Sequence, residues 1–111
     1  MHMEDGLYAV NFSTANDSGS GVFYVRNNII RGGDSGMAYF GSYSEDQNGN
    51  ILGVLRISTH DSSVTSVFGP QAKDFDLIVK GQHNSGNLNL TAIAPDLGNA
   101  SMKITGRRLL G

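Results

Sequence analysis

Apolar residues recur at every second position along most of this chain, in short stretches separated by turn residues. In the stretch GLYAVNFS the alternate positions Tyr8, Val10 and Phe12 are apolar, and the same spacing returns in later stretches. A period of two is typical of β-strands that place one face in a core, because successive side chains point to opposite faces. The pattern predicts about eight short strands, in GLYAVNFS, GVFYVR, a segment around Ile29 and Ile30, MAYFGSYS, NILGVLRIS, FDLIVKG, NLNLTAIA and SMKITG.

Turn residues between these stretches predict how the strands connect. Asn48 and Gly49 lie between two alternating stretches, and this dipeptide favours a type I′ hairpin turn, in which both central residues have a positive φ. The segments NSGN (84–87) and NDSGSG (16–21) predict two further reversals. Short links favour antiparallel neighbours. Residues 59–74 are the exception, since they are numerous enough for one helical turn or a wide crossover.

Strands of this kind have two common arrangements, a two-sheet sandwich and a closed barrel. Closure removes the exposed sheet edges, and an eight-stranded barrel has an interior that side chains fill or that holds one small ligand. We therefore expect an all-β fold, a single antiparallel up-and-down barrel of about eight short strands that forms one domain over residues 1–111. Four aromatic residues are expected to line a ligand cavity in the lumen or to fill it: Phe12, Phe23, Tyr39 and Phe75.

Charge and composition narrow the classes of partner. The chain has 10 acidic and 8 basic residues and a formal net charge of -2, so it lacks the broad basic face that contacts nucleic-acid phosphates. The absence of cysteine excludes disulfides and thiolate metal sites. No apolar run approaches the length of a transmembrane helix, and the first residues do not follow the pattern of a signal peptide. These features predict a cytoplasmic protein that binds neither nucleic acid nor membrane directly.

The corner formed by Gly32, Gly33 and Asp34 has a structural interpretation and a catalytic one. Glycines at a strand corner supply positive φ angles, and an aspartate there bonds to the backbone of its own turn, so we interpret all three as turn residues together with Asn48 and Gly49. A catalytic role would require Asp34 to meet other groups in space. No motif of a nucleophile and its base accompanies it.

The adjacent carboxylates of Glu45 and Asp46 are the second candidate for chemistry. Neighbouring residues on a strand point to opposite faces, so these two do not converge on one bond as acid–base catalysis requires. The segment SEDQNGN is rich in oxygen ligands but lacks the spacing of an EF-hand calcium loop. An enzyme would need Asp34, Glu45 and His60 to come together.

We therefore predict no enzymatic activity, no metal site and no cofactor. Two interpretations of the residues Glu45, Asp46 and Gln47 stay open, a solvated hairpin end and an exposed handle for a protein partner. Both His60 and His83 are expected to be surface residues.

Several short motifs follow one another in an order that is moderately specific. They are MEDGLYAVNF, GSGVFYV, NIIRGGDSGMAYFGSYSED, FDLIVKG and NLNLTAIA, and with gaps they extend over most of the chain. Together they resemble the GrlR family of negative regulators of type III secretion, which are bacterial proteins. The resemblance implies a lipocalin-like β-barrel that forms a homodimer and takes part in transcription regulation through protein contact, without catalysis.

The resemblance also implies a site. The family's exposed acidic stretch, which is implicated in holding a helix-turn-helix transcriptional activator, corresponds to Glu45, Asp46 and Gln47. That stretch has four acidic residues in the family, whereas this chain reads Glu45-Asp46-Gln47-Asn48, so we expect a weaker attraction to a basic partner. The alternative function is a lipocalin-like carrier of a small apolar ligand in the lumen.

Overall fold

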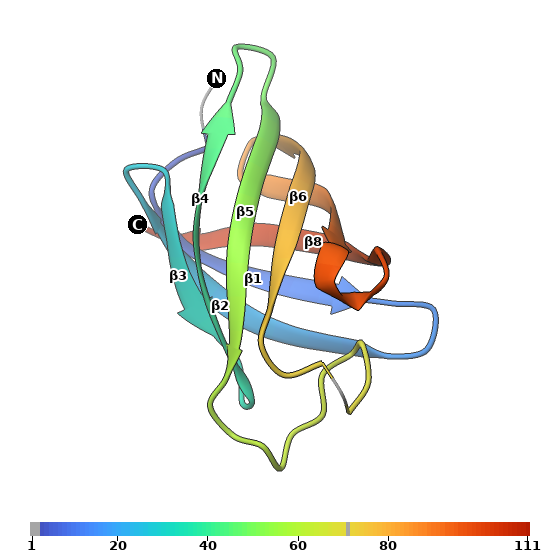
Figure 1. Cartoon of the computed structure of the whole chain (residues 1–111). Coiled ribbons are helices and arrows are strands. Elements are labelled where there is room, and N and C mark those ends of the chain that lie inside the picture. Colours follow the sequence, from blue (N-terminus) through green and yellow to red (C-terminus); the bar gives the residue numbers. More distant parts are fainter. Residues whose placement is uncertain (1–2, 71) are drawn as a thin grey trace.

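A computed structural model describes residues 3–70 and 72–111 and shows eight antiparallel strands in a closed barrel (Figure 1). Each strand pairs with the next one along the chain, and β8 pairs with β1, which closes the wall. The expected all-β, up-and-down barrel is therefore confirmed. The strands are β1 (Gly6–Ser13), β2 (Ser18–Arg26), β3 (Ile29–Gly33), β4 (Met37–Glu45), β5 (Asn50–Thr59), β6 (Phe75–Asn84), β7 (Asn87–Ala94) and β8 (Ala100–Leu110), and a 3-10 turn, η1 (Pro95–Leu97), precedes β8.

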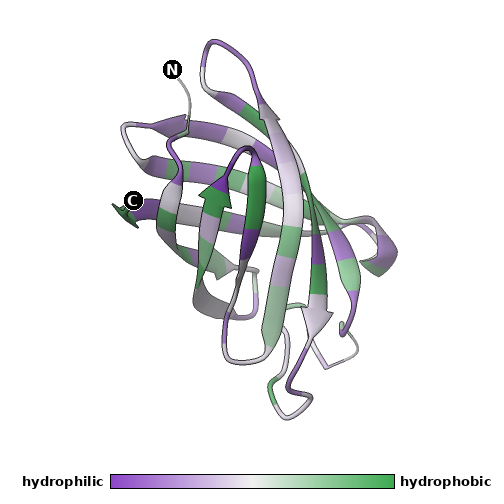
Figure 2. Cartoon of the chain, turned by 90° about the vertical axis from the view of Figure 1, so that its left-hand side faces the viewer, coloured by the Kyte–Doolittle hydropathy of each residue, from purple (hydrophilic) through white to green (hydrophobic). Residues whose placement is uncertain are grey.

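Burial alternates along the strands as the sequence pattern predicts. In β5 the side chains of Ile51, Leu55 and Ile57 are buried in the lumen, while Leu52 and Val54 point outward and are half exposed. The hydrophobic and hydrophilic bands that alternate along the ribbon in Figure 2 follow from this pattern. The core therefore lies inside the wall and not between two sheets, which excludes the sandwich.

The hairpin turns differ from the prediction in two places. The reversal expected at 16–21 lies at residues 14–17, and residues 18–21 belong to β2. The second difference is the turn at Asn48 and Gly49. Two links of two residues have consecutive positive φ angles, as type I′ turns require: Asn27 (52°) with Asn28 (65°), and Ser85 (51°) with Gly86 (86°). The β4–β5 link is longer than two residues, and only Gly49 has a positive φ there (82°). The type I′ prediction for Asn48 and Gly49 is therefore wrong, whereas the reversal predicted at 84–87 is confirmed.

The barrel has two different ends. The "hairpin end" carries the short β2–β3, β4–β5 and β6–β7 links, and the "loop end" carries the other connections. The long connection joins neighbouring antiparallel strands, β5 and β6, and its described residues form turns with one bridge between Ser66 and Gly69. The expected helical turn or crossover is thus wrong. Val67 and Phe68 of this connection pack against the core.

No helix among the described residues is long and apolar enough to cross a membrane.

Candidate functional site

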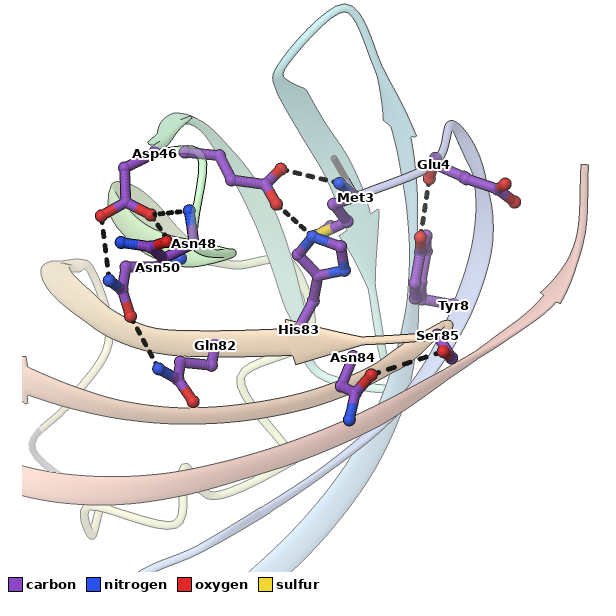
Figure 3. A network of polar contacts seen from close by, with 11 residues as sticks. Met3, Glu4, Tyr8, Asp46, Asn48, Asn50, Gln82, His83, Asn84 and Ser85 are labelled. Atoms are coloured by element: carbon purple, nitrogen blue, oxygen red, sulfur yellow. Dashed lines mark hydrogen bonds and ion pairs between the residues drawn. The ribbon is translucent and has the colours of Figure 1, made fainter. Parts of the chain in front are cut away.

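The first candidate site lies at the hairpin end, where β4 and β6 bring a carboxylate and an imidazole together (Figure 3). The Glu45 side chain is 2% exposed and pairs with Nε2 of His83, whose side chain is 5% exposed. The backbone N–H of Met3 donates a hydrogen bond of 2.7 Å to the same carboxylate. Burial, reinforced by Glu45, raises the pKa of Tyr43 to about 12.

The expected exposure of Glu45 and of His83 is therefore wrong. Tyr39, Tyr43 and Glu45 occupy alternate positions of β4, so Glu45 faces the same side as two buried aromatic residues. His83 occupies the equivalent inward position near the end of β6, two residues after Gly81. The same alternation that predicts the barrel thus turns this carboxylate inward, because it continues to the last residue of the strand.

Asp46, in contrast, lies on the surface and shapes the turn. Its carboxylate accepts hydrogen bonds from the backbone N–H groups of Asn48 (2.8 Å) and Asn50 (3.0 Å), and from the side-chain amide of Asn50 (2.9 Å). These bonds, with the Asn50 side chain as the largest cause, lower the pKa of Asp46. Gln47 and Asn48 are exposed at the tip. The structure thus separates the acidic pair into an internal anchor and a turn former.

Acidification is expected to loosen this turn only below pH 3.8, the ordinary pKa of an aspartate. Because the folded-state pKa is depressed, the hydrogen bonds stabilise the turn above the unfolded-state pKa, and this contribution is lost as the pH falls through the folded-state value. The backbone amide NMR shifts of Asn48 and Asn50 should titrate with a midpoint below 3.8 in the wild type. They should lose this transition in Asp46→Asn, and a wild-type midpoint at or above 3.8 would contradict the assignment.

The second candidate site is a cavity of about 250 Å³ in the lumen, which reaches the loop end. All four aromatic residues expected in the lumen contribute to its lining, namely Phe12, Phe23, Tyr39 and Phe75. Phe12 and Tyr39 meet edge to face with their ring centroids 6.4 Å apart. These side chains therefore line a space and do not fill the lumen completely.

Asp34 lies at this cavity and organises the β3–β4 turn. One carboxylate oxygen accepts hydrogen bonds from the backbone N–H groups of Gly36 (2.9 Å) and Met37 (2.8 Å), and the other accepts a short hydrogen bond from the Tyr39 hydroxyl. Burial and this carboxylate raise the pKa of Tyr39, so its hydroxyl stays protonated and acts as the donor.

The glycines before Asp34 serve a different purpose from the expected one. Gly32 and Gly33 belong to β3, and neither has a positive φ. A Cβ atom at Gly32 would lie 2.2 Å from the carbonyl oxygen of Val22 on the neighbouring strand. The missing side chain therefore permits a close approach of two strands, and the expectation of positive φ angles at this corner is wrong.

The three groups that an enzyme would need do not converge. His60 lies next to Asp34, with its Nε2 atom 2.9 Å from the Asp34 backbone carbonyl oxygen. Glu45 lies at the other end of β4, six residues beyond Tyr39, whose hydroxyl bonds the Asp34 carboxylate; at about 3.3 Å per residue this places Glu45 on the order of 20 Å away. Within residues 3–70 and 72–111, no group of three or more potential metal-ligating side chains occurs.

A feature that the sequence interpretation did not assign is an apolar patch on the outside of the wall. Its members are 38–54% exposed, and they are Phe40, Leu52, Val54, Ile78 and Ile93. Val54 pairs with Ile78 across β5 and β6, and Ile78 pairs with Ile93 across β6 and β7, so these three form a continuous row. Leu52 is the next outward residue of β5, and Phe40 lies diagonally across from Val54 on β4. The sequence does indicate this patch, because in NILGVLRIS and FDLIVKG apolar residues occupy the outward positions as well as the inward ones.

No protein-family model matches this chain, and no curated protein is significantly similar to it. The resemblance to the GrlR family therefore stays a prediction that rests on the order of short motifs.

Proposed function

We propose that this protein is a cytoplasmic, non-enzymatic negative regulator of the type III secretion kind, which acts by binding a protein partner. The observation that carries the proposal is the β4–β5 hairpin, which extends beyond its neighbours at the hairpin end (Figure 1) and has an exposed tip. Asp46 holds this tip in one conformation and buried Glu45 anchors it. A loop that is ordered beforehand loses little entropy on binding.

The resemblance supplies the class of partner, a helix-turn-helix transcriptional activator with basic residues for DNA contact. Of the expected acidic pair, only Asp46 offers its carboxylate to such a surface. A single exposed ion pair contributes only about 0–1 kcal/mol. Tight capture therefore needs the shape of the tip, apolar contact, and two tips in one assembly.

Replacing Gln47 by lysine is expected to weaken binding of a basic partner about fivefold, because it places a positive charge at the tip. Gln47 is exposed, and its side chain takes no part in the hydrogen bonds by which Asp46 defines the turn. Affinity capture from the native host with wild-type bait identifies the partner, and calorimetry with the purified partner gives the dissociation constant.

Asn11→Lys provides the matched control, because Asn11 is exposed on the outward face of β1, away from the apolar patch, and gains the same charge far from the hairpin. Its dissociation constant should equal that of the wild type. Equal binding by wild type and Gln47→Lys would overturn the assignment of the hairpin, and capture without any DNA-binding protein would overturn the proposed regulatory role.

We also propose that the protein forms a homodimer through the outer apolar patch. A closed barrel leaves no free strand edge for pairing, so association depends on side chains of the wall. Val54→Lys is expected to convert the dimer to a monomer in sedimentation velocity, because it places a charge at the centre of the patch. Asn11→Lys, on the outward face of β1, should remain dimeric. A wild type that is monomeric at all concentrations would contradict the proposal.

The second candidate function is a carrier of a small ligand in the lumen. The cavity of about 250 Å³ favours it, since its lining combines apolar walls with a few polar groups at one end. Ligand binding in the cavity and partner binding at the hairpin would use different parts of the molecule. The cavity reaches the loop end, whereas the β4–β5 tip lies at the hairpin end.

A further inference from the structure

The size of the lumen cavity limits its occupant to a small molecule. Its volume of about 250 Å³ lies between an engineered cavity of about 150 Å³ that holds benzene and the range of about 300–1,000 Å³ typical of drug-sized ligands. The inner part of the cavity is apolar, with Leu55, Leu77 and Met102 among the lining side chains. A short hydrocarbon chain or a single ring therefore fits this volume and this lining.

The charged side chains that line the cavity are all acidic. Of the described residues that line the cavity, two are acidic, Asp17 and Asp34, and none is lysine, arginine or histidine. A carboxylate head group would meet like charges there without a basic partner, which is unfavourable in a partly desolvated site. The lining therefore disfavours fatty acids, although its walls suit their chains.

Asp34 is held in place, and among the described residues no cationic side chain pairs with its carboxylate; the His60 ring contacts its backbone carbonyl oxygen instead. Its hydrogen-bond donors are two backbone N–H groups and the Tyr39 hydroxyl, and all three are neutral. A carboxylate has about four acceptor positions, so one remains after these three bonds. The Phe12 and Tyr39 rings line the same cavity, and aromatic faces attract organic cations.

From these observations we infer that the lumen binds a small amphipathic cation, an organic ammonium compound with a short apolar chain. The chain occupies the apolar interior, and the ammonium group lies at the loop end, where Asp34 and Asp17 attract it. This inference rests on the second candidate function, because it names the class of ligand that the lumen would carry.

Three probes with eight carbon atoms each and different head groups test the inference: n-octylamine, n-octanol and octanoate at pH 7, measured by isothermal titration calorimetry. Octylammonium is expected to bind at least about tenfold more tightly than octanoate. Asp34→Asn keeps an oxygen that accepts the turn's backbone bonds but removes the charge, and it should weaken octylammonium binding about tenfold while changing octanol binding less than about twofold. Glu4→Gln, which removes one charge at the hairpin end, should leave all three affinities unchanged.

The outcomes separate the inference from the function on which it rests. Methyl NMR shifts of Leu55, Leu77 and Met102 should change with octylammonium, which places the chain in the lumen. If none of the three probes binds, the carrier function fails. If octanol or octanoate binds as tightly as octylammonium, or if Asp34→Asn leaves octylammonium binding unchanged, the lumen still binds ligands but the inferred selectivity for cations is overturned.

Discussion

Replacing His83 by leucine is expected to lower the free energy of unfolding by about 3–5 kcal/mol. The Glu45 side chain is only 2% exposed, and the substitution removes the imidazole with which its carboxylate pairs. A buried carboxylate that loses one of its partners is less well compensated for its removal from water, which costs free energy. Urea denaturation at pH 7 measures the loss, provided that the dependence of the unfolding free energy on denaturant is unchanged.

The double variant Glu45→Leu with His83→Leu is the decisive control. Replacing both members of a buried polar pair by apolar residues of similar volume is often neutral or stabilising. The double variant should therefore recover most of the stability that His83→Leu loses. A double variant as unstable as the single one would show that packing around residue 83, and not the pairing with Glu45, causes the loss.

The alternation along β4 predicts the inward direction of Glu45 only if the strand is known to continue to residue 45, and the sequence does not mark that end. Glu45 and Asp46 are adjacent, and local composition treats them as one polar hairpin end. Their environments differ because β4 ends between them, so only Glu45 keeps the inward direction of Tyr43. Its partner is 38 residues further along the chain, and only the pairing of β5 with both β4 and β6 brings the two together.

The barrel itself was predictable because a period of two is a local property that repeats in every strand. The lumen was predictable only in part. Alternation places Phe12, Phe23, Tyr39 and Phe75 inside the wall, but whether they fill it depends on the volume left by all the strands and by residues 64–67 of the long connection. That volume depends on how all the strands close together, so it cannot be predicted from any single stretch of the sequence.

The conformation of the β4–β5 turn could not be predicted from the dipeptide Asn48-Gly49 alone, because it depends on the side chain of Asp46. The Asp46 side chain binds the backbone of Asn48 and Asn50, and this local competition changes the length of the loop. Asn27 and Asn28 form the tighter turn instead, since asparagine tolerates positive φ better than most residues.

Gly41→Ala is expected to destabilise the barrel by at least about 3 kcal/mol, a large part of the stability of a domain of this size. A Cβ atom at Gly41 would lie 1.9 Å from the backbone carbonyl oxygen of Val54 and 2.9 Å from the Cα atom of Leu55, both on β5. Backbone atoms of a paired strand cannot rotate away as a flexible side chain does. The β4 and β5 strands must therefore separate locally, which weakens hydrogen bonds of the barrel wall.

Gly106→Ala separates this steric effect from the general consequence of replacing a strand glycine. Its Cβ atom would meet the Val10 Cγ1 atom at 3.0 Å and the Ala9 carbonyl oxygen at 3.1 Å, so a shift of a few tenths of an ångström relieves the contact. Alanine also restricts the unfolded chain, which stabilises a protein by about 0.4–1 kcal/mol where the native backbone is compatible. Gly106→Ala should therefore change the unfolding free energy by less than about 1 kcal/mol. Of these two positions, Gly41 alone places the new atom as close as 1.9 Å to a backbone atom. Similar losses for the two variants in urea denaturation would therefore show that the approach of β4 to β5 at Gly41 is not the cause.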